Sequence, residues 1–336
     1  MKKKILFIIL AVIFLSGAYA AWKFLGPSVK APENKYFYIR TGESFASVRN
    51  NLGEQGIVPG LKWFDWTSRL IGFKQVKPGR YEIRNGMSLL DLVRMLRNGK
   101  HSPVDFVITK IRTKETLASR IGRAFECDST RMIEFLNNPD SLRAYNLDTN
   151  TVMAAAMPYT YTIRWNSDAG KIFEQFYRAY KLFWTDERKE KAKSLGLTPE
   201  QVSTLASIID EETNAESDKP NVASVYLNRM AKGMPLQADP TVKFAMKNFG
   251  LKRILKAHLE TDSPYNTYRN RGLPPGPICT PDLKTIDAVL NSPKTDYIYF
   301  VASSAFDGTH IFTSNYNDHL KYARIYQQEL NKRNIR

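Results

Sequence analysis

The chain begins with a basic flank followed by a long apolar segment. Residues 2–4 are all lysine, and residues 5–22 are apolar, with Ser16 and Gly17 as the weakest points of the run. About 17–25 apolar residues span a bilayer, so this segment is just long enough. Positive charge at its start predicts that this end stays in the cytoplasm. We therefore predict a transmembrane anchor over residues 1–25.

A cleaved signal peptide is the competing interpretation of the same segment. Its apolar core would be Ile5 to Leu15, and Ala18-Tyr19-Ala20 resembles the small-x-small pattern of a cleavage site. Either interpretation takes the rest of the chain out of the cytoplasm. Both therefore argue against a nucleic-acid partner.

Alternating and helical apolar patterns follow a short linker at 26–34, and they predict small α/β units over residues 36–137. The order of strand, turn and capped helix occurs more than once, which we interpret as a weak internal repeat; chance recurrence of common elements is the alternative. The predicted strands are 36–40, 81–83 and 104–108, and the predicted helices are 45–52, 63–71, 89–96, 113–124 and 132–136.

A polar break over residues 137–151 separates these units from a larger domain, which we place at 150–336. One long helix is predicted over 169–195, and strands are predicted over 297–302 and 310–313. The fold class is therefore α+β, with an N-terminal anchor, a small α/β region and a larger mixed domain.

The segment after residue 197 is the most informative part of the chain. Thr198 is a helix N-cap signal with Pro199 at the first helical position and Gln201 completing a capping box. The apolar stripe of this helix includes Leu205 and Ile209, and Glu212 falls on it.

Three acids end this helix, and helical geometry separates them. Asp210 and Glu211 are expected to lie off the stripe, whereas Glu212 follows Leu205 by seven residues. An acid on an apolar face loses solvation and its pKa rises. A carboxyl that stays protonated near neutral pH is what cleavage of a glycosidic bond requires. Glu216, one turn later, is the second candidate, although acids near a helix end are more often solvated or paired with a nearby cation.

Three later loops carry the polar and aromatic groups that a sugar site needs. Aromatic faces contact the apolar side of a sugar ring, and amides or hydroxyls bind its rim, whereas a proline-rich turn gives a fixed wall. The loops are Leu236-Gln237-Ala238-Asp239-Pro240-Thr241, Tyr265-Asn266-Thr267-Tyr268 and Gly272-Leu273-Pro274-Pro275-Gly276.

The composition indicates little more than a basic, globular protein that is exported. The 336 residues carry a formal net charge of +16, which favours an anionic partner or is simply a lysine-rich surface. Cys127 and Cys279 match no metal spacing, and the four histidines are scattered, so we expect neither a metal nor another cofactor. We interpret His310 as structural, with lining of the cleft as the alternative.

The motif Ser207-Ile208-Ile209-Asp210-Glu211-Glu212-Thr213 and the three loops resemble the YceG-like family of endolytic murein transglycosylases. The late segments 299–302 and 310–313 fit the same order. The resemblance implies a membrane anchor, a LysM-like region over 36–137 and a YceG-like catalytic domain over 150–336. It also implies a location in the cell membrane, crossed once, with the catalytic domain outside the cytoplasm.

The resemblance implies cleavage between N-acetylmuramic acid and N-acetylglucosamine, leaving 1,6-anhydro ends and limiting the length of nascent glycan strands. Glu212 matches the catalytic acid/base of the family, and cell-wall synthases are implied partners. Two positions depart from the family pattern: Asp210 replaces a glutamate, and Tyr159 replaces an aspartate. The departure at Tyr159 puts any role of that position in doubt. We expect the substrate to be bound by Gln237, Asp239, Tyr265, Asn266, Thr267 and Tyr268.

Three other functions remain open on the sequence. A non-catalytic wall-binding scaffold would use only the LysM-like region. A hydrolytic muramidase needs a second carboxylate about 5–9.5 Å away, for which Asp239 is the candidate. Binding of an anionic polymer through net charge would depend steeply on salt.

Overall fold

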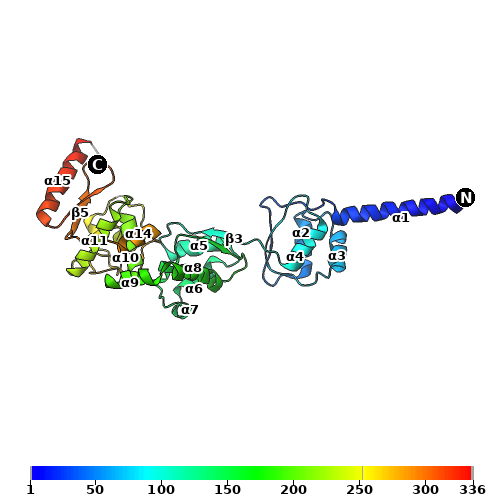
Figure 1. Cartoon of the computed structure of the whole chain (residues 1–336), viewed down its shortest axis with the longest axis horizontal. Helices are drawn as coiled ribbons and strands as arrows, with labels where there is room; N and C mark the ends of the chain where they lie inside the picture. Colours follow the sequence, from blue (N-terminus) through cyan, green and yellow to red (C-terminus); the bar gives the residue numbers. More distant parts are fainter. Residues whose placement is uncertain (1, 252, 334–336) are drawn as a thin grey trace. The chain divides into compact units, whose positions relative to one another are not determined.

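The structure is a computed structural model that describes residues 2–251 and 253–333. The chain divides into two compact units. The first contains the residues up to Asp105 together with 124–127 and 162–168, and the second contains 106–123, 128–161 and the residues from 169 onward. Mixed helices and strands in both units confirm the α+β class (Figure 1).

The first unit is a two-stranded antiparallel sheet with helices around it. Tyr36 lies opposite Glu82 in the sheet, and Ile39 lies opposite Gly79. Every second strand residue, such as Phe37, is buried in the core, as the alternating pattern predicts. Its elements are α1 (Lys2–Leu25), β1 (Tyr36–Ile39), α2 (Phe45–Glu54), α3 (Leu61–Leu70), β2 (Gly79–Glu82) and α4 (Leu89–Asn98).

Helix α1 covers the predicted anchor. It is long and apolar enough to cross a membrane over Lys3–Leu25, and its apolar side chains are exposed along most of its length. The Ser44 and Ser88 side chains accept hydrogen bonds from backbone N–H groups of α2 and α4, so they cap these two helices.

The second unit is mainly helical. From residue 104 onward the elements are β3 (Val104–Val107), α5 (Lys114–Ala124), α6 (Ser129–Asn137), α7 (Pro139–Arg143), a 3₁₀ turn (Val152–Ala155), β4 (Thr160–Ile163), α8 (Ala169–Phe183), α9 (Asp186–Ser194) and α10 (Pro199–Glu212), and β3 and β4 each have residues in both units. They continue with α11 (Lys219–Ala231), α12 (Asp239–Ala245), α13 (Lys256–Leu259), α14 (Leu283–Leu290), β5 (Tyr299–Ala302), β6 (His310–Thr313) and α15 (Tyr316–Lys332).

The predicted helix over 169–195 is wrong, because the structure has two helices there. Thr185 has an extended backbone and its side chain accepts a hydrogen bond from Arg188 N, so it caps a new helix. Trp184 just before it is buried. A buried tryptophan followed by a capping threonine turns the chain between α8 and α9.

The main boundary between the two units lies at residues 105 and 106, earlier in the chain than the predicted boundary at 137. Strand β3 pairs with β4, a strand from the middle of the chain. Most of residues 106–137 is grouped with the second unit, and the internal repeat and the predicted domain bounds stay predictions. The LysM-like assignment stays a prediction.

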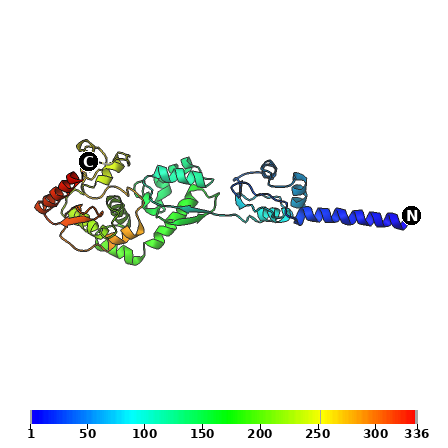
Figure 2. The same cartoon turned by 90° about the horizontal axis from the view of Figure 1, so that it is seen from above.

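Helix α10 is the central element of the second unit. It packs against α11, α12 and α14, and its residues from Val202 to Asp210 are all buried. The predicted capping box at Thr198 and Gln201 is confirmed. This packing fixes the position of the C-terminal end of α10 within the second unit; Figure 2 gives a second view of the chain.

Candidate active site

Glu212 is the last residue of α10 and opens onto a pocket. Thr213 turns to an extended backbone and ends the helix there. The pocket has a volume of about 530 Å³. We call it the Glu212 pocket; it is lined by Glu212, Thr213, Asn214, Ala215, Ala302, Ser303, Phe306, Asp307, Gly308, Thr309, His310 and Tyr326.

The surroundings of Glu212 raise the pKa of its carboxyl from 4.5 to about 7. Burial is the largest cause, because it disfavours the charged form, and the negative charge of Asp239 adds to it. A hydrogen bond from Tyr226 and the positive charge of Lys243 act in the opposite direction. The side chain keeps some surface toward the pocket, so a carboxyl near half-protonation at neutral pH is still accessible to a substrate.

Tyr226 is the immediate partner of this carboxyl, and sequence reasoning missed it. Its hydroxyl donates a hydrogen bond of 2.8 Å to Glu212 Oε1 from the middle of α11. Burial raises the pKa of Tyr226 well above 10, so it remains a donor. Its ring packs edge-on against Phe300 of β5. Its position among apolar residues of α11 gave no signal in the sequence.

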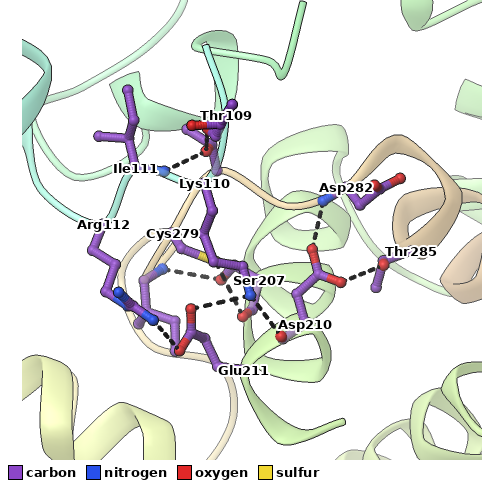
Figure 3. Close-up of polar contacts among 12 residues, drawn as sticks. Thr109, Lys110, Ile111, Arg112, Ser207, Asp210, Glu211, Cys279, Asp282 and Thr285 are labelled. Atoms are coloured by element: carbon purple, nitrogen blue, oxygen red, sulfur yellow. Dashed lines mark hydrogen bonds and ion pairs between the residues drawn. The ribbon is translucent and has the colours of Figure 1, made fainter. Parts of the chain in front are cut away.

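Asp210 is buried, which corrects the expectation that it lies off the buried face. Its carboxylate is 2.8 Å from Lys219 Nζ. It also accepts hydrogen bonds from Thr285 Oγ1 and Asp282 N, which Figure 3 shows. Helix α14 covers this side of α10, so the helix is enclosed beyond its apolar stripe. The acid is held as an ion pair within the protein.

Glu211 is also paired rather than solvated. Lys110 Nζ lies 3.3 Å from one carboxylate oxygen and Arg112 lies 2.9 Å from the other, as Figure 3 shows. The two cations come from the segment just after β3. Within the described part of the chain, Glu212 alone of the three acids has no cation within ion-pair distance.

Glu216 does not extend the catalytic face of α10, because the helix ends at Glu212. Its side chain is 60% exposed and pairs with Lys219 at 2.6 Å. The assumption that it lies one helical turn after Glu212 was wrong.

The first predicted binding loop alternates between buried and exposed residues. Leu236 and Ala238 are buried, whereas Gln237 and Asp239 are exposed. Gln237 has a positive φ of 56° and accepts a hydrogen bond from Arg229. Asp239 accepts a hydrogen bond of 2.6 Å from the Tyr268 hydroxyl. Both predicted side chains therefore face outward from a fixed backbone.

The second predicted loop holds its shape through its central residues. Asn266 is fully buried, and its amide donates to the backbone oxygens of Leu259 and Thr261. Thr267 is also buried and bonds to Thr241 and to Ala238 N. In this conformation neither side chain has a group left open to a ligand.

The two tyrosines of that loop remain accessible. Tyr265 packs against Phe244 at 4.7 Å between ring centroids, and burial raises its pKa to about 12. Tyr268 is half-buried, and its charge interaction with Glu212 shows that it lies near that carboxyl. The loop therefore presents two aromatic faces from a rigid base.

The proline-rich turn is fixed by a close backbone contact. A Cβ atom at Gly276 would lie 2.0 Å from the Asn150 backbone oxygen, so only glycine fits. Just beyond it, Ile278 N donates to Ser207 Oγ of α10. The turn is thereby attached to the helix that carries the three acids.

His310 lines the Glu212 pocket and is also structurally held. Asp218 Oδ2 accepts from His310 N and lies 3.0 Å from His310 Nδ1. Both interpretations made from the sequence therefore apply. The rest of this wall comes from the β5–β6 hairpin and α15, which the sequence did not connect with the acid.

A larger pocket of about 760 Å³ lies near the start of α10. Its carboxylates are already engaged: Asp148 accepts hydrogen bonds from Asn150 N and Thr151, and Glu200 accepts one from Tyr180. The smaller Glu212 pocket is therefore the better candidate for the active site.

Comparison with known proteins gives the family. The sequence model of the YceG-like family matches residues 37–325. A Bacillus subtilis protein named endolytic murein transglycosylase is 28% identical over 313 residues, covering 88% of this chain and 85% of that relative. A Streptococcus pneumoniae protein of the same name is 25% identical, and the match covers 93% of this chain but only 63% of that relative.

A crystal structure of a YceG-like protein from Listeria monocytogenes is also similar. The TM-score is 0.57 at 28% sequence identity, and the match covers 85% of this chain and 98% of the other. These findings confirm the resemblance drawn from the four motifs. Since the family match extends over most of its length, the chain belongs to the YceG-like family.

Proposed function

We propose that this protein is a lytic transglycosylase that cleaves peptidoglycan strands, with Glu212 as its acid/base. The observation that carries the proposal is a carboxyl with a pKa of about 7 opening onto a pocket and hydrogen-bonded to a neutral tyrosine. The names of the relatives in Bacillus subtilis and Streptococcus pneumoniae support the same reaction.

In the proposed reaction, protonated Glu212 donates its proton to the glycosidic oxygen between N-acetylmuramic acid and N-acetylglucosamine. As that C–O bond breaks, positive charge develops on the muramyl C1. The Glu212 carboxylate then accepts the proton of the muramyl 6-hydroxyl, whose oxygen bonds to C1. The 1,6-anhydro product forms without water, and Glu212 regains its proton.

A single residue can carry both proton transfers because its pKa is close to neutral pH. The efficiency of an acid/base group is greatest when its pKa lies near the working pH. Tyr226 keeps one carboxyl oxygen engaged as a permanent donor, which leaves the other for the substrate. Asp239 and Tyr268, with Gln237, would bind the sugars beside this acid, and Tyr265, which lines a separate pocket with Phe244 and Lys247, would contact sugars farther along the strand.

The test is product analysis on purified glycan strands. Wild type should release products with 1,6-anhydro ends, and Glu212→Gln should lose roughly 10²–10⁴-fold in rate, the range for removal of an acid/base group. Glu190→Gln makes the same change on an exposed face of α9 and is the matched control. Equal rates in wild type and Glu212→Gln would refute the proposal.

A muramidase is the alternative reaction, and Asp239 is the candidate for its second carboxylate, because it is exposed and its charge helps to raise the pKa of Glu212. Hydrolysis would give reducing ends that are one water heavier than anhydro ends. Mass analysis of the same products therefore separates the two reactions. Binding without any product would instead favour a wall-binding scaffold.

We further propose that α1 anchors the protein in the cell membrane with both units outside the cytoplasm. Its length, its exposed apolar side chains and the basic residues at its start support this orientation. A cell-wall synthase is the partner that an anchored enzyme limiting the length of nascent strands would need. Association with such a synthase would be tested by cross-linking in intact cells.

A further inference from the structure

Helix α3 of the first unit has one exposed face of mixed apolar and basic character. Four of its residues at helical spacing form this face, whereas Phe64, Thr67 and Ser68 are buried on the other side. Trp66 is 60% exposed and Leu70 is 72% exposed. We call this surface the α3 face; it consists of Lys62, Trp66, Arg69 and Leu70.

The α3 helix lies against the last turns of α1, as Figures 1 and 2 both show. The Trp63 ring is 6.1 Å from the Tyr19 ring and 5.4 Å from the Phe24 ring. Trp66 stacks on Phe24 at 5.6 Å. These contacts join the α3 face directly to the end of α1 that faces away from Lys4.

The contacts fix the depth of α3 if α1 spans the membrane as proposed above. Residues 5–25 rise about 31 Å at 1.5 Å per residue, close to the hydrocarbon thickness of about 30 Å. Tyr19 lies six residues before Leu25 and therefore about 9 Å inside the outer end of this span. A helix that touches both Tyr19 and Phe24 lies at the level of the outer membrane–water boundary.

The chemistry of the α3 face fits that boundary. Tryptophan is enriched where hydrocarbon meets headgroups, because its ring is apolar and its N–H is polar. Lysine and arginine extend apolar stems and place their charges among lipid phosphates. Helices of this kind bury their apolar face about 5–10 Å into the boundary, which matches the depth set by Tyr19.

We propose that the α3 face binds the outer leaflet of the same bilayer that α1 crosses. Trp66 and Leu70 enter the boundary between headgroups and acyl chains, and Lys62 and Arg69 contact lipid phosphates. The first unit is then held against the membrane at two places, α1 and α3. The inference rests on the proposed anchor and is independent of the reaction at Glu212.

The experiment uses the full chain with a fluorescent label on a single introduced cysteine. Trp66→Cys and Leu70→Cys change exposed positions, and the native Cys127 and Cys279 are buried, so the label goes to the new site. The labelled protein is reconstituted into phosphatidylglycerol–phosphatidylcholine vesicles with or without a lipid that carries a nitroxide near its headgroup.

The matched control is Lys100→Cys. Lys100 is exposed and follows α4, whose other end is joined to the segment after α1 by the bridge between Pro27 and Ser88. Lys100 does not belong to the α3 face, so its label shows whether quenching is confined to that face. Its label should keep its emission in nitroxide vesicles.

The expected result is loss of roughly half or more of the emission at positions 66 and 70, since both labels would lie within the 5–10 Å boundary layer. Unquenched labels on an intact chain in the membrane would overturn the docking and leave the anchor standing. A label shielded from water but not quenched by lipid would overturn it in favour of a protein partner. Equal quenching at position 100 would overturn it as unspecific adsorption.

The anchor is checked by the intact mass of the membrane-bound protein. A chain that lacks residues 1–20 would overturn the anchor and the docking together. Glycan cleavage in the same vesicles reports separately on the proposed reaction, because it depends on Glu212 and not on the α3 face.

Discussion

Replacing the proposed acid/base should make the protein more stable, and only above a defined pH. Glu212 has a pKa of about 7 in the folded chain, against an ordinary value of 4.5. Below pH 4.5 the carboxyl is protonated in both the folded and the unfolded chain. Between 4.5 and about 7 the unfolded chain loses the proton while the folded chain retains it, so the free energy of unfolding falls as the pH rises.

The size of this effect follows from the displacement of the pKa. Each pH unit corresponds to about 1.4 kcal/mol, so a rise from 4.5 to about 7 amounts to about 3 kcal/mol of lost stability at alkaline pH. Glu212→Gln keeps the size of the side chain, and its amide oxygen can still accept the hydrogen bond from Tyr226. The variant should therefore recover about 3 kcal/mol at pH values above the folded pKa.

Scanning calorimetry of the full chain in detergent would measure this difference. About 3 kcal/mol corresponds to a rise in Tm of roughly 6–12 °C for a unit of this size. The rise should be present at about pH 8.5, one to two units above the folded pKa, and absent near about pH 3.5, where both states keep the proton. Glu190→Gln, on the exposed surface of α9, should change Tm at neither pH.

The pH dependence of this stabilisation shows whether the raised pKa of Glu212 is its cause. A stabilisation of the same size at both pH values would mean that the glutamine packs better and that burial does not raise the pKa of Glu212. Equal stability of wild type and variant at alkaline pH would mean that the carboxyl ionises freely, and the proposed acid/base would lose its physical basis.

Three further substitutions have definite expected outcomes. Tyr226→Phe removes a hydrogen bond that favours the Glu212 carboxylate, so its pKa rises further and the alkaline limb of the pH profile of kcat/KM should move up by about one unit. Gly276→Ala forces a Cβ against the Asn150 backbone oxygen and should lower the stability by about 1–3 kcal/mol in urea unfolding. Asp210→Asn leaves the buried Lys219 ammonium group with only the exposed Glu216 as its anion, and the same measurement should show a loss of about 3 kcal/mol, the lower end of the range for breaking a buried ion pair.

The position and burial of a residue could be predicted from the sequence wherever they depend on its own helix or turn. The capping box at Thr198 fixed the start of α10, and helical phase placed Glu212 on the face that becomes enclosed. The hydroxyl of Tyr226 could not be assigned in this way, because its partner lies on the next helix and nothing in α11 marks that position. The fold brings the two together through packing rather than through a local pattern.

The same limit explains the error at Asp210. Helical phase describes one stripe, but α10 is covered on several sides, and α14 meets the side that the stripe left open. The break at Trp184 was missed for a related reason. The helical pattern continues through the break, and it is the burial of one tryptophan that turns the chain.

The three adjacent acids show how one functional group acquires three roles. Asp210 accepts hydrogen bonds from three donors, including Lys219, so its role is structural. The shorter side chain at this position therefore changes a supporting contact and not the chemistry.

Glu211 forms ion pairs with two cations and thereby attaches the segment after β3 to α10. Glu212 has a neutral tyrosine as its partner instead of a cation. Burial raises the pKa of Glu212 and the tyrosine hydrogen bond lowers it, so neither protonation state is strongly favoured. A group that must first donate a proton and then accept one works best under that condition, since a cation at this position would hold it as a carboxylate and a fully apolar shell would hold it as an acid.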